Sequence, residues 1–445
     1  QAPSGYTNKY FDNVNISPRI GFNWDVRGDR TTVVRGGTGV FVGRIPFAWL
    51  GYAFYNDGVG FGSFDVNNIA GKNKGDVLAD GAKTFAFNNG QANLVQTDLI
   101  ANGFKMPKVM RSNIAIDQTI QGYKFTIEGL YTQVLTDLMF QQINFKTDAA
   151  NYSYFSYDVN REMPIYNGVK INSNLSNAYA LSNTDKGYRY SYTASVNKKY
   201  PFGVDLYAAY TYGVSKDITN GIRNSMESNW QLNQSLTPND PQLAYSNFDV
   251  RHRFVSNISY KFNKTQIGLL FNSQSGVPFT WGLVNATLAG TPQAAGLVYI
   301  FSDVNQATTY LPVAGQAQAF MDFVNSDSYL SSRKGKFTER NGDRTPWSTT
   351  LDMRFLQNCG KHLQFTADIF NLTNLLNNEW GKIYFVSNTF NSTSSVGLAK
   401  TAGSFSSAGV LTDALFSFSK PTQLPYSVDN INSKWQIQLG LRYNF

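Results

Sequence analysis

The chain has 445 residues, of which 15% are aromatic and only 15% are charged, although its mean hydropathy is −0.30. Ordinary soluble domains carry about 25% charged residues, and no run of about 18 apolar residues is present, which excludes a helical membrane protein. The net charge of +8 comes from Lys and Arg scattered singly along the chain. Because they form no basic block, nucleic acid is not an expected partner.

Apolar and polar residues alternate with period two in segments along the whole chain, as in strands with one apolar and one polar face. In the last segment, Trp435, Ile437, Leu439 and Leu441 alternate with polar residues or glycine. Taken in chain order, the pattern predicts about eleven strands, near residues 17–27, 31–41, 112–119, 123–145, 188–198, 203–213, 247–262, 265–281, 347–357, 361–372 and 434–445.

The segments between these strands are alternately short and long. The long ones run over residues 42–112, 146–187, 214–246, 282–347 and 373–433. A soluble β-sandwich also alternates in polarity, but structureless loops of this length are unusual in a compact domain. Short periplasmic turns alternating with long extracellular loops are typical of outer-membrane barrels. We therefore predict an all-β fold, an antiparallel transmembrane β-barrel in contact with outer-membrane lipids.

The strand count has a consequence for domain organisation. With the last strand ending in the periplasm, the strand at 17–27 enters from outside, and an odd number of strands does not close an ordinary bacterial barrel. We expect residues 1–445 to be the C-terminal part of one barrel domain, with the partner strands upstream.

Four groups of segments carry a family resemblance: 15–24 with 32–41, 248–255, 344–354 with 368–374, and the closing strand 434–445. Together they resemble the barrel of TonB-dependent receptors of Bacteroidota, in particular the Oar-like group. The resemblance implies a barrel of 22 strands, of which these would be the last, and an N-terminal plug domain. The plug and the segment that contacts TonB have no counterpart here, so both partners would act through the missing N-terminal region. The final Phe445 resembles the assembly signal of outer-membrane barrels.

Charged residues on the polar side of the strands are candidates for a wet lumen. We expect them to pair with one another or to face the plug, and we prefer this interpretation to general acid–base catalysis. The plug-facing candidates are Arg251, Arg253, Asp352, Arg354, Asp368 and Arg442. The chain has two histidines and one cysteine without ligand spacing, and no nucleophile elbow. We therefore predict no metal site, no cofactor and no enzymatic activity.

Aromatic residues in the long loops are candidates for ligand capture, because such rings stack on sugars, peptides or chelates. The candidates are Trp49, Tyr52, Phe54, Tyr55, Tyr310, Phe320 and Tyr329. Two alternatives stay open for them: packing of loop on loop, and binding of a partner such as a surface lipoprotein.

Two functions follow from these predictions. The first is TonB-dependent transport of a ligand captured by the extracellular loops. The alternative is a non-transporting scaffold subunit of an outer-membrane assembly or secretion complex. The sequence leaves the substrate open among iron chelates, peptides, glycans and polypeptides.

Overall fold

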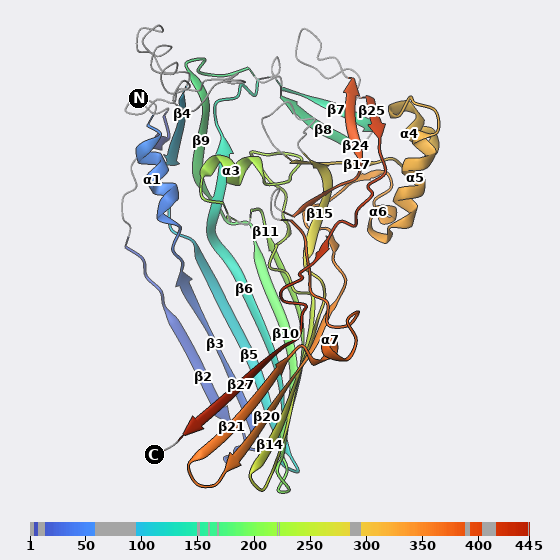
Figure 1. Ribbon diagram of the computed structural model, residues 1–445. Helices are drawn as coiled ribbons and strands as arrows, with labels where there is room; N and C mark the ends of the chain where they lie inside the picture. The colour runs from blue at the N-terminus through green and yellow to red at the C-terminus, as the bar shows by residue number, and fades with distance from the viewer. Residues whose placement is uncertain are drawn as a thin grey trace, which may run out of the picture.

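A computed structural model shows a long, curved antiparallel sheet with folded connectors at one end (Figure 1). The structure describes residues 4–7, 14–57, 95–148, 152–158, 161–166, 169–219, 221, 223–284, 295–387, 392–402, 415–443 and 445. Within these ranges, eleven strands follow one another across the sheet in chain order, each antiparallel to the next. The predicted meander of about eleven strands is confirmed.

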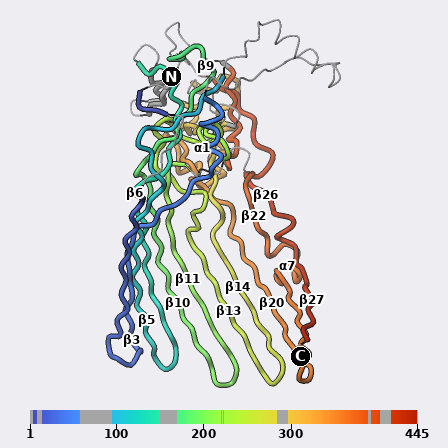
Figure 2. Tube along the Cα trace, turned by 90° about the vertical axis from the view of Figure 1, so that its left-hand side faces the viewer, coloured from blue at the N-terminus to red at the C-terminus, as the bar shows by residue number. Residues whose placement is uncertain are grey.

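The eleven strands form what we call the wall. They are β2 (Arg19–Asp25), β3 (Thr32–Val42), β5 (Lys108–Ile120), β6 (Tyr123–Gln142), β10 (Tyr188–Lys199), β11 (Val204–Asp217), β13 (His252–Phe262), β14 (Thr265–Gln274), β20 (Ser348–Cys359), β21 (Leu363–Phe370) and β27 (Gln436–Tyr443). Among the described residues, β2 pairs only with β3, and β27 only with β21, so the curved sheet has two open edges (Figure 2).

Cross-strand pairing gives the wall one apolar and one polar face, because directly paired residues lie on the same side of a sheet. Near its middle, for example, Leu206, Ile258, Leu269 and Met353 are successive partners on four neighbouring strands. The same register carries Phe22, Ile114, Phe125, Leu351 and Leu439 to this face, and most polar residues of the strands to the other. The predicted facing of the alternating segments is thus confirmed.

Aromatic side chains concentrate near both ends of the apolar face, where a barrel meets lipid headgroups. The lower group, near the short turns, includes Tyr123, Tyr200, Tyr260, Phe262 and Tyr443; Phe445 packs edge-on against Tyr443 with ring centroids 5.7 Å apart. In this group the ammonium of Lys198 lies 4.4 Å from the Tyr123 ring centroid, which suits a basic side chain at a membrane interface. The upper group includes Tyr190, Tyr212, His252 and Trp347.

Five short turns connect strands at one end of the wall, at residues 26–31, 121–122, 200–203, 263–264 and 360–362. Gln121 and Gly122 both have positive φ, of 51° and 76°, which is the backbone of a two-residue hairpin turn. Asn263 also has positive φ, a conformation that Asn tolerates better than most residues. Tight turns at one end leave all five long connectors at the opposite end.

The long connectors carry their own short elements, which the periodicity of the sequence does not reveal. The helices are α1 (Phe47–Tyr55), α3 (Met226–Gln231), α4 (Val304–Tyr310), α5 (Gln316–Ser326), α6 (Ser328–Ser332) and α7 (Leu372–Leu376). The strands are β1 (Tyr6–Thr7), β4 (Val95–Ala101), β7 (Tyr152–Asp158), β8 (Arg161–Tyr166), β9 (Leu175–Thr184), β12 (Ala244–Tyr245), β15 (Pro278–Val284), β16 (Ala295–Leu297), β17 (Tyr299–Ile300), β18 (Lys336–Phe337), β19 (Asp343–Arg344), β22 (Tyr384–Phe385), β23 (Thr393–Ser395), β24 (Leu398–Ala402), β25 (Leu415–Phe418) and β26 (Ser427–Val428). Most of these pairs are antiparallel, but β4 with β9 and β15 with β23 are parallel.

Two predicted strands exceed the observed ones by five or more residues at the connector end. The predicted strand 247–262 begins only at His252, because residues 246–251 form turns around the buried carboxylate of Asp249. The predicted strand 265–281 is divided into β14 and β15, which belong to different sheets. Between them the backbone passes very close to Thr345, where a Cβ on Gly276 would lie 1.8 Å from the carbonyl oxygen, so only glycine fits.

The two faces predict responses of different size to a new charge in the middle of β13. We expect Ile258→Arg to destabilise the protein in lipid by about 2–4 kcal/mol, because its side chain lies on the apolar face. The neighbouring Asn257→Arg lies on the polar face and should have a much smaller effect. Unfolding of the full-length protein from lipid vesicles measures both. Equal losses of unfolding free energy in the two variants would contradict the assignment of Ile258 to the apolar face and Asn257 to the polar face.

Candidate functional site

The polar face of the wall holds the first set of candidate residues. Register places Arg253, Asp352, Arg354, Asp368 and Arg442 on this face, as predicted. The Arg354 and Asp368 side chains form an ion pair at 3.4 Å, and Asp352 accepts a hydrogen bond from the backbone N–H of Asn371 at 2.7 Å. The Arg354 side chain remains 64% exposed, so one carboxylate does not cover it.

A second charged group on the polar face was not among the predicted residues. Arg35 lies between two carboxylates, 3.3 Å from Asp117 and 3.2 Å from Glu128, and Lys124 lies 3.3 Å from Asp117. These four side chains come from β3, β5 and β6. The signal for them was present, because all four occupy polar positions of predicted strands.

Arg251 lies in the connector layer instead of on the strand wall. Its guanidinium is 3.2 Å from Asp249 and lies 4.5 Å from the centroid of the Tyr245 ring. Asp249 has a fully buried side chain and also pairs with Arg344. Its second oxygen accepts a hydrogen bond from the backbone N–H of Ser215, so one carboxylate ties two connectors to the top of β11. The predicted plug-facing role of Arg251 therefore finds no support in its position.

At one side of the connector end, several connectors share a hydrophobic core that we call the α1 core. It contains Ile45, Trp49, Ala53, Ile100, Phe104, Leu138, Phe140, Phe145, Tyr179, Leu181, Met226 and Trp230. Trp49 is 1% exposed, packs edge-on against Phe140 at 5.2 Å and donates its indole N–H to the carbonyl of Arg223 at 2.9 Å. In this conformation Trp49 packs loop on loop. Phe54 and Tyr55 of the same helix are exposed, and Tyr52 is half-buried.

The connectors between β14 and β20 and between β21 and β27 share a second core, which we call the α5 core. It includes Phe279, Trp281, Tyr299, Ile300, Phe301, Phe320, Val324, Leu330, Val396 and Phe416. Phe320 is fully buried, and the Tyr310 ring stacks on Phe301 with centroids 5.3 Å apart. The Tyr329 hydroxyl accepts a hydrogen bond from the backbone N–H of Glu339, and burial raises the pKa of Tyr329 to about 12. These aromatics thus hold the layer together.

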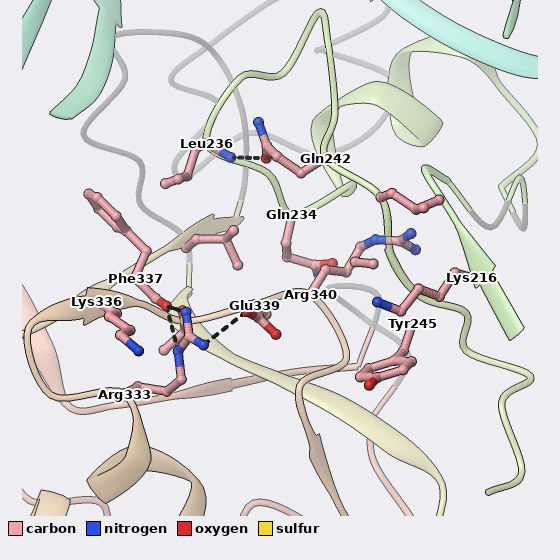
Figure 3. A pocket seen from close by; sticks show the side chains of 14 residues that line it. Lys216, Gln234, Leu236, Gln242, Tyr245, Arg333, Lys336, Phe337, Glu339 and Arg340 are labelled. Carbon is pink, nitrogen blue, oxygen red and sulfur yellow. Dashed lines mark hydrogen bonds and ion pairs between the residues drawn. The ribbon is translucent and has the colours of Figure 1, made fainter. Parts of the chain in front are cut away.

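A cavity of about 490 Å³ opens between connector 218–251 and the segment 297–340 (Figure 3). We call it the basic pocket. Four cations line it, Lys216, Arg333, Lys336 and Arg340, and Glu339 is the only carboxylate of the lining. The uncharged polar part consists of Gln234, Gln242, Tyr245 and Thr338, and Leu236, Leu243, Leu297 and Phe337 belong to the apolar part. No local sequence pattern predicts it, because its residues come from separate connectors.

Other kinds of site have less support. Among the residues that the structure describes, no three His, Cys, Asp or Glu side chains gather closely enough to hold a metal ion. No helix in the described ranges is both long and apolar enough to cross a membrane.

One buried carboxylate lies on β4, the strand that contributes Ile100 to the α1 core, and has no cation partner among the described residues. Asp98 on β4 accepts hydrogen bonds from the side-chain amides of Asn56 and Gln96, each at 3.0 Å. None of the described residues provides a cation within ion-pair distance of it. Burial disfavours the charged form and so raises the pKa of Asp98 above its ordinary value. The same effect raises the pKa of the nearby Glu227.

Comparison with known proteins gives one family. The model of the outer membrane beta barrel domain matches residues 1–408. No curated protein matches the chain at a significant level.

Solved structures that resemble the chain include the outer membrane transporter YddB from Escherichia coli, with 13% identity and a TM-score of 0.44 over 97% of this chain and 41% of that one. Pseudomonas aeruginosa FpvA, solved bound to heterologous pyoverdines, has 9% identity and a TM-score of 0.40, covering 96% of this chain and 33% of that one. The siderophore receptor PirA from Acinetobacter baumannii has 9% identity and a TM-score of 0.40, covering 81% and 37%. The chain therefore spans less than half the length of each of these proteins.

The buried carboxylate of Asp249 leads to a prediction about connector stability. Asp249→Ala should destabilise the connector layer by about 3 kcal/mol, because it leaves Arg251 and Arg344 without their shared partner. Asp240→Ala, in the same connector, breaks only an exposed pair with Lys186 and should change stability by less than about 1 kcal/mol. Hydrogen exchange of residues 244–251 in the full-length protein measures the effect, and equal protection in both variants would refute the anchoring role.

The burial of Asp98 gives a prediction about pH. Because its folded-state pKa is raised, its contribution to stability is full below the ordinary Asp value and is lost as pH rises through the folded pKa. Asp98→Asn should therefore slow hydrogen exchange of β4 at neutral and alkaline pH and lose this advantage below about pH 4. Exposed Asp185→Asn serves as the control. If the difference in β4 hydrogen exchange between wild type and Asp98→Asn did not change with pH, the result would contradict the burial argument.

Proposed function

Since the chain belongs to the family of outer membrane beta-barrel domains, which places it in the bacterial outer membrane, we propose that it forms part of the wall of a TonB-dependent transporter. Residues 1–445 supply eleven strands, the charged face of the lumen and the extracellular surface that captures ligand. Further strands and a plug come from polypeptide outside this chain. The role of these residues is structural and ligand-binding, without catalysis.

The observation that carries the proposal is the charged face of a sheet with two open edges. An odd set of strands does not close an ordinary barrel, and bacterial barrels with 22 strands enclose a plugged lumen. Three arginines on this face have exposed side chains that are available to carboxylates of a plug: Arg253, Arg354 and Arg442. This supports a lumen filled by protein.

Folded connectors also support ligand capture. The α1 core and the α5 core fix the extracellular layer, while Phe54 and Tyr55 remain exposed at its surface. Exposed aromatic rings at a fixed position can stack on a ligand with little loss of conformational freedom. Their exposure equally favours a second function, in which α1 docks a surface lipoprotein or another subunit of an outer-membrane assembly.

The plug is tested in the full-length protein with a photo-cross-linking amino acid. Placed at Arg354, on the polar face, the probe should form intramolecular cross-links to the plug segment of the full-length protein, upstream of the barrel strands. Placed at the next residue, Phe355, it lies on the apolar face and should react with lipid only. Mass spectrometry identifies the linked peptides, and a probe at position 354 that reaches no upstream peptide would contradict a plugged lumen.

Energy coupling is tested in cells. A deletion strain should lose uptake of one compound from a panel of iron chelates, glycans and peptides, and a strain without TonB should lose the same uptake. A deletion strain that keeps every uptake but loses a co-purifying surface protein would establish the scaffold function instead.

A further inference from the structure

We propose that the basic pocket binds a phosphate group of a glycolipid headgroup in the outer leaflet of the membrane. The inference goes beyond transport, because it concerns the lipid around the barrel and not the ligand that passes through it. It rests on three observations: the face of the wall to which the pocket belongs, the surplus of cations around it, and its mixed lining.

One edge of the pocket, formed by Lys216 and Tyr245, lies on the lipid-facing side of the wall. In the ladder between β10 and β11, Tyr190, Val214, Tyr192 and Tyr212 lie on the apolar face, and Lys216 follows on the same face. Tyr245 is the direct partner of Lys216 in the pairing of β12 with β11. Both residues therefore stand just beyond the upper aromatic group, on the extracellular side, where headgroups begin.

The pocket has more cations than carboxylates to pair with them. Arg333 pairs with Glu339 at 2.8 Å, and the buried Arg340 pairs with Asp217 at 2.6 Å. Lys216 and Lys336 have no carboxylate within ion-pair distance among the described residues. Their ammonium groups carry the charge that remains to attract an anion.

Further positive charge lies beside Lys216. Three cations surround the Tyr245 ring, with Lys216 at 4.7 Å, Arg251 at 4.5 Å and Arg344 at 5.8 Å from its centroid. A single carboxylate, Asp249, pairs with the two arginines. Three cations and one carboxylate leave the electrostatic potential around Lys216 positive. The compact ammonium group of Lys216 is a suitable point-charge partner for phosphate.

The lining suits an amphiphile better than a free anion. Leu236, Leu243, Leu297 and Phe337 form the apolar part of the pocket, and Leu243 is exposed. Phe248, in the turn that leads into β13, is 66% exposed on the same connector. A headgroup with phosphate, sugar ring and acyl chains would contact both parts, with the chains against the apolar face below.

The experiment titrates the full-length protein in detergent with a bis-phosphorylated lipid A, and native mass spectrometry measures binding. The test variant is Lys216→Gln combined with Lys336→Gln. Two contributions of about 1 kcal/mol each correspond to an about thirtyfold weaker affinity. The control, Lys264→Gln with Lys361→Gln, removes the same charge from the short turns and should bind normally. Lys216→Arg with Lys336→Arg should also keep binding, which separates charge from a folding defect.

Two further titrations identify the source of the phosphate. Lipid A without its phosphates should bind as weakly to wild type as intact lipid A binds to the Gln variant. Inorganic phosphate and glucosamine 1-phosphate should compete poorly, since they lack acyl chains. Strong competition by either soluble anion would overturn the lipid assignment in favour of a soluble phosphorylated ligand. Equal affinities of the Gln variant and its control for lipid A would overturn the proposal that the basic pocket is the binding site.

Discussion

The whole molecule depends on one constraint, the pairing of backbone groups across a sheet that has lipid on one side. Hydrocarbon supplies no hydrogen-bond partners, so a strand that crosses the membrane must bond to its neighbours along its length. Once the ladder is fixed, every second side chain faces lipid and the rest face the lumen, and a shift by one residue would reverse them all. The continuous register from β2 to β27 therefore decides the position of each charge on the wall.

Beyond the membrane the connectors obey a different rule, because water is available and hydrophobic residues must find each other. The α1 core and the α5 core each draw residues from several connectors. Two buried carboxylates in this layer have different partners. Asp249 pairs with two arginines, whereas Asp98 accepts hydrogen bonds from side-chain amides, and burial raises its pKa. The connector layer thus has hydrophobic cores of its own, as a small globular protein does.

The sequence predicts the wall well and the connector layer poorly. Period two is a local property, so the facing of Ile258 or Arg354 could be inferred from neighbours along the chain. The burial of Trp49 and Phe320 depends on partners far away in sequence, such as Phe140 and Phe418, which no local pattern identifies. Arg251 shows the boundary between the two cases, because alternation assigns it to the polar face but does not predict the turns around Asp249 that place it over Tyr245. The basic pocket has no local pattern, since Lys216 and Lys336 come together only through folding.

The length of β6 has a mechanical consequence. This strand of 20 residues pairs with β5 over residues 123–136 and with β10 over residues 123–133, and its last six residues, 137–142, pair with β9. Its register with β5 shifts between Val134 and Thr136. The same strand therefore connects the wall directly to the α1 core, to which it contributes Leu138 and Phe140. The residues of the α1 core are therefore already ordered before a ligand binds. Binding then loses little free energy to the ordering of these residues.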